Sequence, residues 1–448
     1  MTALPGQAGT RVPAAKVTTV SSLSALQSAA AGAAPGDTVQ LADGSYSGTV
    51  KLSKSGASGA PVTVRAEHVG KATISGTGIT WGSGVSYVTV SGFVFKGSSG
   101  MSVPVGDTHD RISRNVFQLA SSVGNWLTVS GDDTEVDHNT FQHKTTAGVF
   151  FQLLGPGSNG IAQRVWVHHN YFFDHQFKGT NGGESIRFGL SGRQHASAHG
   201  IIEYNLFEHA DGDSEAISVK SSDNIVRYNT LRDTRGTISL RHGWGTTVEG
   251  NYVLGGQSGI RFFGNNHTII NNVVQGSSGL ELEVGGGEVR DDTTSGTDHE
   301  AADNCLVAFN TIVGTGGVVK FNNGKQYPPS HITFADNIVE GGSGSAVTGG
   351  GSSLSWQGNI LHTGSAGIMP SSGYRSVDPK LATDPAGLYR IGSGSTAIGA
   401  ATGSYPQVTL DMDGQARPTA KDVGADQYVA GGADREPLTT AQVGPNAP

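Results

Sequence analysis

Charged residues recur at a nearly constant interval in the middle of the chain. The segments AISVKS, TISLRHG, GIRFFG and GLELEV each alternate apolar with polar residues, which is typical of a strand with one buried face. If the apolar residues face inward, the outward residues are Lys220, Arg241, Arg261 and Glu281, in steps of 21, 20 and 20 residues. Strands stacked about 4.8 Å apart would align these four side chains in a column about 15 Å long.

The predicted column carries three cations, and His242 lies beside it. Like charges at this spacing repel each other, so a purely structural column would be expected to alternate its signs. A polyanionic chain lying along the column would remove the repulsion, and the guanidinium group of arginine binds carboxylates with two parallel hydrogen bonds. The alternative interpretation is a solvated charged face that binds no ligand.

Acidic and amide residues come shortly before the predicted column. Asn181 and Glu184 lie in TNGGESIRFG, and Asp213 and Glu215 lie in DGDSEAIS. Oxygen ligands gathered at turns are what Ca²⁺ requires. Asn-Gly and Asp-Gly pairs also form ordinary turns, so an interpretation without metal stays open from these residues alone.

An internal repeat predicts the elements that position these residues. A six-residue pattern recurs along the chain, as in VRYNTL and VEGNYV. It consists of an apolar or aromatic residue, two variable residues, Asn, one further residue and an apolar residue. Several successive copies are 20 to 25 residues apart. The asparagines are Asn115, Asn139, Asn170, Asn205, Asn229, Asn251, Asn272, Asn310, Asn337 and Asn359. We expect each Asn to occupy a left-handed backbone position before a turn and to hydrogen-bond along a ladder.

One strand-rich coil per repeat predicts an all-β fold, a single-domain right-handed parallel β-helix. Residues 1–18 are predicted to be an N-terminal extension and residues 19–430 the β-helix. Within it, residues 22–31 form an amphipathic helix that caps the first coil, and residues 379–430 form a C-terminal closure. Residues 431–448 are interpreted as a polar tail, and the long steps between Asn139 and Asn205 and between Asn272 and Asn310 as loops that wall a cleft.

The composition limits the partners of the chain. Its formal net charge is −8 and no Lys/Arg-rich run exists, so nucleic acid is not an expected partner. No run of 18 apolar residues exists, so we expect no membrane span, and the single Cys305 cannot form an internal disulfide. The first residues form no signal sequence, but the 68 glycines and low charge favour export, so a secreted or periplasmic location is expected.

Four motifs resemble polysaccharide lyase family six, which contains the alginate lyases and chondroitinase B. The motifs are NGGESIRFG (181–189), SEAISVKSSDNIVRYN (214–229), LRDTRGTISLRHG (231–243) and GIRFFGNNHTIINN (259–272). They cover the centre of the chain, and a general likeness to β-helices extends to both ends. The Lys-Ser and Leu-Arg-His-Gly motifs, one coil apart, are specific in combination.

The resemblance implies cleavage of an alginate chain by β-elimination, with Lys220 as the base. Arg241 is then the acid or, because its pKa is high, the group that stabilises charge on the leaving oxygen. The remaining contacts implied with the substrate are His242, Arg261, Arg187, Glu184, His267 and Glu281. The resemblance also implies a Ca²⁺ ion that neutralises the uronate carboxylate, held by Asn181, Asp213 and Glu215, with Glu184 as a possible fourth ligand.

Other functions fit the same residues. A chondroitin or dermatan sulfate lyase would share the site, and a mannuronan epimerase would need a second proton donor that the sequence does not identify. A non-catalytic β-helical carbohydrate-binding protein would not need Lys220, Arg241 and the acidic residues to converge. We expect a monomer or weak dimer that binds an anionic polysaccharide.

Overall fold

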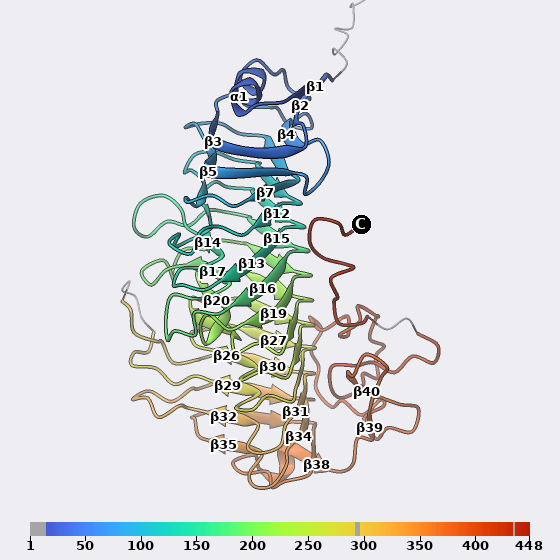
Figure 1. Ribbon diagram of the computed structural model, residues 1–448. Coiled ribbons are helices and arrows are strands. Elements are labelled where there is room, and N and C mark those ends of the chain that lie inside the picture. Colours follow the sequence, from blue (N-terminus) through green and yellow to red (C-terminus); the bar gives the residue numbers. More distant parts are fainter. Residues whose placement is uncertain (1–14, 292–295, 433–434) are drawn as a thin grey trace, which may run out of the picture.

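Short alternating segments of the computed structural model stack into a parallel β-helix (Figure 1). The structure describes residues 15–291, 296–432 and 435–448. The first coils contribute strands to two parallel sheets and most later coils to three, and alternate apolar side chains fill the interior. The predicted fold class, an all-β parallel β-helix, is confirmed.

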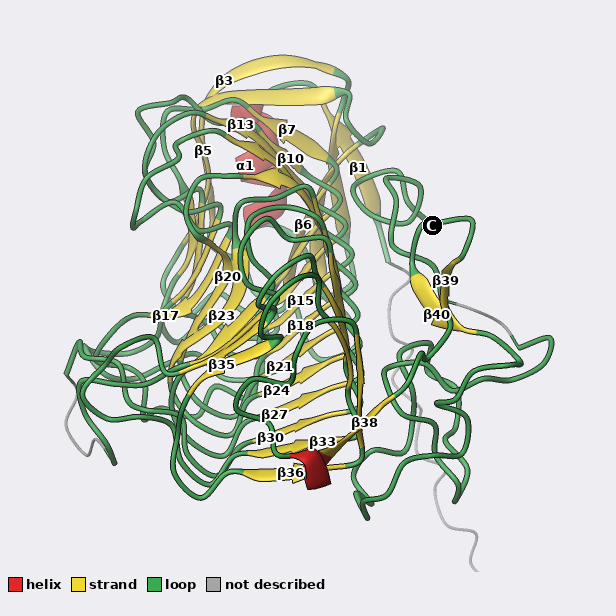
Figure 2. Cartoon of the chain, turned by 90° about the horizontal axis from the view of Figure 1, so that it is seen from below, coloured by secondary structure: helices red, strands yellow, loops and turns green. Residues whose placement is uncertain are grey.

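Three sheets form the walls of the solenoid (Figure 2); sheets 1 and 2 run its whole length, and sheet 3 runs from Met101 to Gly349. Sheet 1 contains β1 (Val17–Val20), β2 (Thr38–Leu41), β4 (Val62–Ala66), β6 (Val88–Ser91), β9 (Arg111–Ser113), β12 (Glu135–Asp137), β15 (Trp166–His168), β18 (Ile201–Glu203), β21 (Ile225–Arg227), β24 (Thr247–Glu249), β27 (Thr268–Ile270), β30 (Leu306–Ala308), β33 (Thr333–Ala335) and β36 (Ser355–Gln357). Sheet 2 contains β3 (Gly44–Leu52), β5 (Ala72–Trp81), β7 (Phe93–Phe95), β10 (Val116–Phe117), β13 (Thr140–Lys144), β16 (Tyr171–His175), β19 (Leu206–Ala210), β22 (Thr230–Arg232), β25 (Tyr252–Leu254), β28 (Val273–Gln275), β31 (Thr311–Val313), β34 (Ile338–Glu340), β37 (Asn359–His362) and β38 (Tyr374–Ser376). Sheet 3 contains β8 (Met101–Val103), β11 (Leu127–Val129), β14 (Phe151–Leu153), β17 (Ile186–Gly189), β20 (Glu215–Lys220), β23 (Thr237–His242), β26 (Ile260–Phe262), β29 (Leu282–Val284), β32 (Val319–Phe321) and β35 (Val347–Gly349).

The predicted asparagine ladder lines the turn between sheets 1 and 2. The backbone N–H of each Asn donates to Oδ1 of the Asn in the next coil, as from Asn205 to Asn229 at 3.0 Å, and the pattern runs unbroken from Asn115 to Asn359. One detail of the prediction is wrong. The left-handed conformation belongs to the residue before each Asn, such as Tyr204 (φ 51°) and Tyr228 (φ 55°). That residue turns the chain outward, so that the Asn side chain can point into the bend.

A single helix covers the N-terminal end, as predicted. Helix α1 (Leu23–Ala31) begins after Ser22, whose side chain accepts the N–H of Ala25, and it buries Leu23, Leu26 and Ala30 against the first coils. Strand β1 starts at Val17, so the coil begins slightly earlier than the predicted boundary at residue 19. Most of the predicted extension, residues 1–14, lies outside the described residues.

The C-terminal segment lies along the side of the solenoid and does not close its end. Residues 379–430, which contain the antiparallel pair β39 (Leu381–Thr383) and β40 (Tyr389–Ile391), pack beside sheet 2 (Figure 2). There Leu388 and Met412 bury against Tyr252 and Val273. The last coil is instead covered by the short helix η1 (Ser371–Gly373) and the preceding loop, where Met369 is buried.

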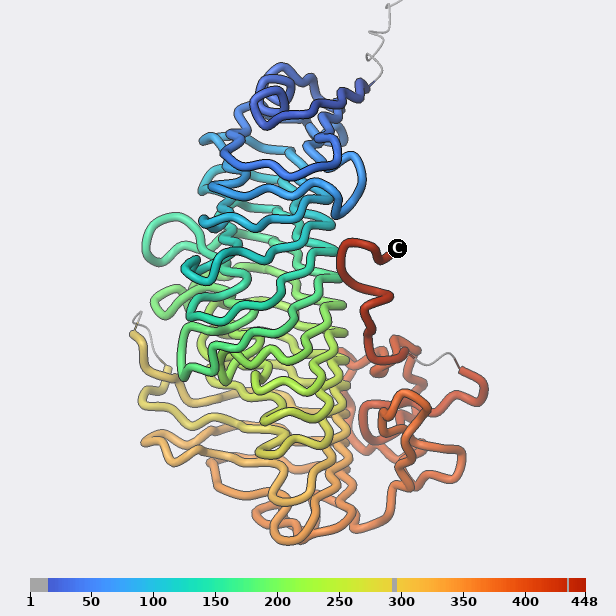
Figure 3. Tube along the Cα trace, in the orientation of Figure 1, coloured from blue at the N-terminus to red at the C-terminus, as the bar shows by residue number. Residues whose placement is uncertain are grey.

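The predicted polar tail is also packed against the solenoid. Residues 435–448 run back along the coils (Figure 3), and Leu438 and Val443 bury against Leu206. The guanidinium group of Arg435 lies 4.0 Å from the ring centre of Tyr252. This segment therefore contributes a small apolar cluster, which its polar composition did not predict.

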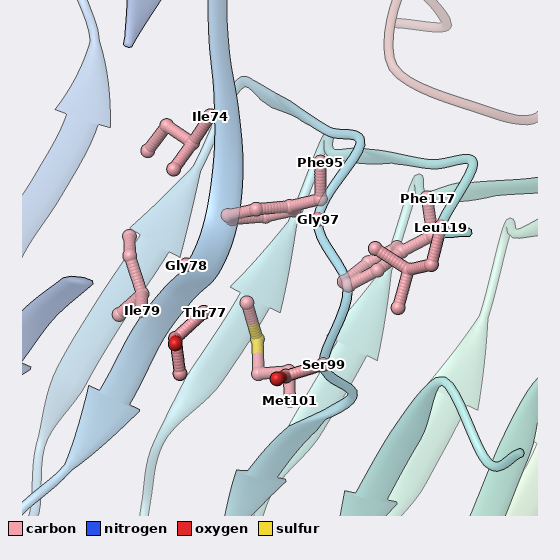
Figure 4. A pocket seen from close by; sticks show the side chains of 10 residues that line it. All are labelled: Ile74, Thr77, Gly78, Ile79, Phe95, Gly97, Ser99, Met101, Phe117 and Leu119. Atoms are coloured by element: carbon pink, nitrogen blue, oxygen red, sulfur yellow. The ribbon is translucent and has the colours of Figure 1, made fainter. Parts of the chain in front are cut away.

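No helix in the described part of the chain is long and apolar enough to cross a membrane. In the N-terminal coils, a small hollow between Ile79, Phe95 and Met101 is lined mainly by apolar groups (Figure 4). It contains no charged side chain and belongs to the core. The polar side chains that could do chemistry lie on sheet 3.

Candidate active site

The outer face of sheet 3 carries the predicted charged residues, but in a different register. Lys220 pairs with His242, because a bulge in the pairing of β20 with β23 makes Arg241 an extra residue. Arg261 pairs with Ser239 on one side and with Glu283, not Glu281, on the other. The predicted single column of Lys220, Arg241, Arg261 and Glu281 is therefore wrong. Equal spacing in sequence did not reveal the bulge.

Two small residues separate the cations on this face. Arg187 of β17 and Arg261 of β26 flank Ser218 and Ser239, which pair with each other in the intervening strands. Ser218 and Ser239 therefore separate the two guanidinium groups, and we call this pair of serines the floor of the site. The side chains of Lys220, Glu215 and Arg241 border that floor.

Lys220 and Arg187 share a buried carboxylate. Nζ of Lys220 lies 3.3 Å from Oε1 of Glu184, and NH1 of Arg187 lies 3.5 Å from Oε2 of the same residue. Burial lowers the pKa of Lys220 from its ordinary value of 10.5, while the nearby Glu184 and Glu215 act in the opposite direction. Arg187 also donates through Nε to the side chain of Gln152.

Arg241 and Arg261 share a second buried carboxylate, that of Glu215. NH1 of Arg241 lies 3.2 Å from Oε1 of Glu215, and Arg261 donates to the same oxygen. The pKa of Glu215 is lowered: burial alone would raise it, but the two guanidinium groups outweigh that effect. Nε of Arg241 is buried and has no hydrogen-bond partner among the described residues.

These ion pairs correct the argument made from like charges. Each cation around the floor already pairs with buried Glu184 or Glu215, so the repulsion between cations is reduced and does not by itself require a polyanionic ligand. An incoming carboxylate would instead compete with, or join, the existing pairs. A buried carboxylate that holds a cation in place fixes its position for binding.

Two loops contact His242. Its Nε2 lies 3.2 Å from Oγ of Ser191, and its ring stacks on that of His299 with centres 5.6 Å apart. Nε2 of Gln194 donates to the carbonyl of Gly296, and this loop bridge joins residues 190–200 to the segment just before His299. Burial, with His299 and Arg241 nearby, lowers the pKa of His242 to about 3, so the ring is neutral near pH 7.

Two residues predicted to contact substrate do not reach the outer face. His267 is 1% exposed, and its ring nitrogens bind the carbonyl of Phe263 and the N–H of Thr246. Glu281, in the turn before β29, is also 1% exposed, and its side chain lies against Gly314. Burial raises the pKa of Glu281 to about 7. Both side chains are part of the packing between coils.

The predicted metal ligands lie at the edge of the floor where the strands of sheet 3 begin. Asp213 is buried, and its carboxylate accepts the backbone N–H of Gly183 at 3.3 Å. Burial raises its pKa, and the negative charges of Glu184 and Glu215 raise it further. Asn181 is exposed in the adjacent loop.

This donor set fits a hard cation in two respects. Negative charge gathers at Asp213, and Oε2 of Glu215 is buried without a hydrogen-bond partner among the described residues. The oxygens of Glu184, Asp213 and Glu215 do not all lie within 4.8 Å of one another, so these side chains would have to move closer together to share one ion.

Comparison with known proteins now identifies the arrangement. The model of the family described as chondroitinase B matches residues 20–340, well over half of the chain. The chain belongs to this family, polysaccharide lyase family six. A comparison with curated proteins gives no match.

Solved structures of polysaccharide lyase family six share the fold. The alginate lyase AlyGC superposes with a TM-score of 0.73 at 23% identity, over 94% of this chain and 59% of AlyGC, so this chain spans just under three fifths of AlyGC. A mannuronic acid specific family-six lyase from human gut microbiota gives 0.69 at 24% identity, over 81% and 91% of the two chains. Pedsa3628 from Pseudopedobacter saltans gives 0.69 at 20%, over 96% and 99%.

Sequence reasoning missed three polar neighbours of the family-six site. Gln152 contacts Arg187, and both Ser191 and His299 contact His242. The positions of Ser191 and His299 depend on how the loops fold back over sheet 3, whereas Gln152 lies on β14 and pairs in register with Arg187. The only signal was the length of the predicted loop regions, and His299 does lie in the long step between Asn272 and Asn310.

Proposed function

We propose that this chain is an alginate lyase that cleaves a uronate polysaccharide by β-elimination, with Lys220 as the base. The observation that carries the proposal is the position of Lys220: its ammonium group is nearly buried on the face of sheet 3, beside Glu184 and within the same cluster as Arg241. A lysine acts as a base only when its pKa falls toward the working pH, and burial lowers the pKa here.

The proposed reaction moves one proton and breaks one bond. Neutral Lys220 takes the proton from C5 of a uronate unit, the electrons of that C–H bond form the C4–C5 double bond, and the C4–O4 bond breaks. The departing O4 takes up a proton from water, and the proton on Lys220 returns to solvent, which leaves one new end with an unsaturated sugar and one with a free hydroxyl. The acidity of C5 depends on neutralising the adjacent carboxylate.

Arg241 is proposed to stabilise the negative charge that develops on O4. A guanidinium group keeps its proton at working pH, so electrostatic stabilisation fits Arg241 better than donation of its own proton. Glu215 holds one terminal nitrogen of Arg241, and Nε has no partner among the described residues. The group therefore retains hydrogen-bonding capacity for an incoming oxygen.

Arg187 and Arg261 are proposed to bind uronate carboxylates on either side of the serine floor. Arg261 is partly exposed and is held by Glu215 and Ser239, so its orientation is fixed before substrate binds. His242 is neutral and covered by the loop bridge, so we assign it a positioning role rather than a carboxylate contact.

A calcium ion is proposed to bind at Asp213 and Glu215, with Asn181 and Glu184 as further oxygen donors. When bound, it would neutralise the carboxylate of the reacting uronate and so make the C5 proton more acidic. The gathered negative charge at Asp213 and the unpartnered Oε2 of Glu215 support this assignment.

Alginate is the proposed substrate because solved structures of similar fold include alginate lyases, one of them in complex with G6. Dermatan or chondroitin sulfate is the second candidate, because the matching family model is that of chondroitinase B. Polymers of this size do not cross membranes, so the proposal places the protein outside the cytoplasm, as its composition suggested.

A digest distinguishes the candidates. Polymannuronate, polyguluronate and dermatan sulfate would each be incubated with the protein, and the ultraviolet absorbance of the unsaturated product would be followed. The proposal expects the absorbance to rise with at least one alginate block. A rise with dermatan sulfate alone would favour the second candidate, and binding without any rise would favour a carbohydrate-binding protein.

A further inference from the structure

A polar hollow adjoins the catalytic floor at the beginning of the strands of sheet 3. It has a volume of about 120 Å³ and spans the coils of β20, β23, β26 and β29. Its lining residues are Ser214, Arg235, Thr237, Gln257, Ser258, Ile260, Arg261, Leu280 and Glu283. Of these, only Arg261 belongs to the site residues assigned above.

The hollow is continuous with the active site but distinct from the reacting centre. Thr237 pairs with Glu215, which holds Arg241 and Arg261. Nζ of Lys220 lies beside Glu184 in the coil of β17, whereas the hollow is lined by residues of the coils of β20, β23, β26 and β29. Because neighbouring coils are about 4.8 Å apart, the middle of the hollow lies two or three coils from the reacting nitrogen. A sugar ring there is therefore not the ring whose proton Lys220 removes.

Thr237 supplies a polar atom that has no hydrogen-bond partner in the described part of the chain. The residue is 5% exposed, and its Oγ1 is buried without a hydrogen bond to any described residue. Buried hydroxyl groups are normally paired, because an unpaired one loses its hydrogen bond to water. A hydroxyl group of a ligand in the hollow would satisfy it.

Arg235 supplies an anchored cation. Its NH1 donates to the carbonyl of Gly179 at 2.7 Å, and its Nε lies 3.3 Å from Oε1 of Gln257. Unlike the other arginines of the site, it forms no ion pair with a described carboxylate at hydrogen-bond distance. Its guanidinium group is therefore oriented and still free to bind an anion.

Glu283 sets a limit on the charge of that anion. It is half-buried in the same hollow and pairs in register with Arg261 on the next strand. A carboxylate accepts hydrogen bonds from sugar hydroxyls but repels a second negative charge. The combination of Arg235 with Glu283 therefore suits a unit with one carboxylate and several hydroxyls better than a sulfated unit.

We propose that this hollow is a binding subsite for a uronate unit at a distance from the bond that is cleaved. Arg235 binds the carboxylate of that unit, and Thr237, Gln257 and Glu283 bind its hydroxyl groups. The subsite selects long, non-sulfated uronate chains. This assignment deepens the proposed function and rests on it for the identity of the substrate.

Three variants test the subsite. Arg235→Ala removes the anion contact, and Thr237→Val keeps the shape while removing the hydroxyl. Arg232→Ala is the matched control, because Arg232 is three residues away but pairs with Glu208 on sheet 2. Each variant would be assayed on oligouronates of increasing length, from the shortest that is cleaved to the polymer.

The subsite predicts a loss that depends on length. Arg235→Ala and Thr237→Val should raise KM about tenfold or more on long oligomers, with Arg235→Ala the larger, while leaving the shortest cleaved oligomer within about twofold of wild type. Arg232→Ala should match wild type at every length. An equal loss at all lengths, or no loss at any length, would overturn the assignment.

A binding arm separates this proposal from the proposed function. The same substitutions would be placed in a Lys220→Ala background, and calorimetry with short and long oligouronates and with dermatan sulfate would measure affinity without turnover. If the wild type cleaves nothing, the proposed function fails, and the subsite still stands when Arg235→Ala weakens binding of long oligouronates alone. Equal affinity with and without Arg235, or tighter binding of dermatan sulfate, would overturn the subsite even if the protein is a lyase.

Discussion

Nζ of Lys220 lies 3.3 Å from Oε1 of Glu184, and only 5% and 1% of the two side chains are exposed. The proposed base is thus held by a carboxylate that also binds Arg187. Glu184 stabilises the protonated form of Lys220, whereas burial favours the neutral form that can accept a proton. The balance between the two effects determines the pH at which the site can work.

Removing the charge of Glu184 should shift the pH profile of activity. In wild type, activity should fall as the pH drops through the pKa of Lys220, because the protonated amine cannot act as a base. Glu184→Gln removes a neighbour that raises this pKa, so the acid limb of kcat/KM should move to lower pH. Glu208→Gln, whose partner Arg232 lies on sheet 2, is the control. A shift of the acid limb to higher pH would contradict the assignment of Lys220.

Calcium should affect both activity and stability through Asp213. Exhaustive chelation should abolish turnover, and Ca²⁺ should restore it better than Mg²⁺, which prefers regular octahedral sites and releases its waters reluctantly. Ca²⁺ should also raise the melting temperature of wild type but not that of Asp213→Asn. Full activity after chelation, together with an unchanged melting temperature, would show that Arg187, Arg241 or Arg261 neutralises the uronate carboxylate instead.

Glu281 should make the protein less stable as the pH rises. Its pKa is about 7 in the folded protein and 4.5 in its ordinary state, so between these values the folded state holds a proton that the unfolded chain has released. Stability should therefore fall as pH rises through this window, by about 3 kcal/mol in total. Glu281→Gln should be more stable than wild type at pH 8 and equal to it at pH 4 in denaturant unfolding.

Glu283→Gln, on the outer face of β29, is the control for the stability of Glu281→Gln. Because Glu283 is half-exposed, its replacement should change the stability by no more than about 0.5 kcal/mol. If Glu281→Gln kept the pH dependence of wild type, Glu281 would be ionised in the fold and its packing role would be wrong.

The asparagine ladder should contribute strongly to stability. Asn229 accepts from the backbone of Asn205 and donates to the carbonyl of Ile202 and to Asn251, all in the buried turn. Asn229→Ala leaves several of these groups unpaired and should lower the free energy of unfolding by about 2–4 kcal/mol. Asn159→Ala, at an exposed loop position, should have little effect. Equal stability of the two variants would contradict the structural role of the ladder.

The sequence predicted the parts of this molecule that repeat. The asparagine ladder, the capping helix and the outward direction of Lys220 and Arg261 follow from periodicity, since each coil has the same inward pattern. The family motifs also lie where the structure places Glu184, Glu215 and Arg241 together. The left-handed residue before each Asn could not be read from residue type alone, because glycine, asparagine or aspartate occupies it in four coils and arginine, histidine, tyrosine or phenylalanine in the other six.

Features that break the repeat were not predictable. The bulge at Arg241 moves one residue out of register, and the alternation of TISLRHG gives no sign of it. His299 reaches His242 only because a long loop folds back over sheet 3. His267 and Glu281 have the polarity of ligand-binding residues, but the backbone around them buries their side chains.

The most direct test of the account is the turnover of Lys220→Ala on the alginate block that wild type cleaves best, followed by ultraviolet absorbance. Lys220→Arg serves as a second variant because it keeps the charge but does not release a proton near neutral pH, and circular dichroism and melting temperature verify that both variants fold. The account predicts that each variant loses about a hundredfold or more in kcat, as expected when a general base is removed. If a folded Lys220→Ala keeps more than about a tenth of wild-type turnover, Lys220 is not the base and the proposed mechanism is wrong.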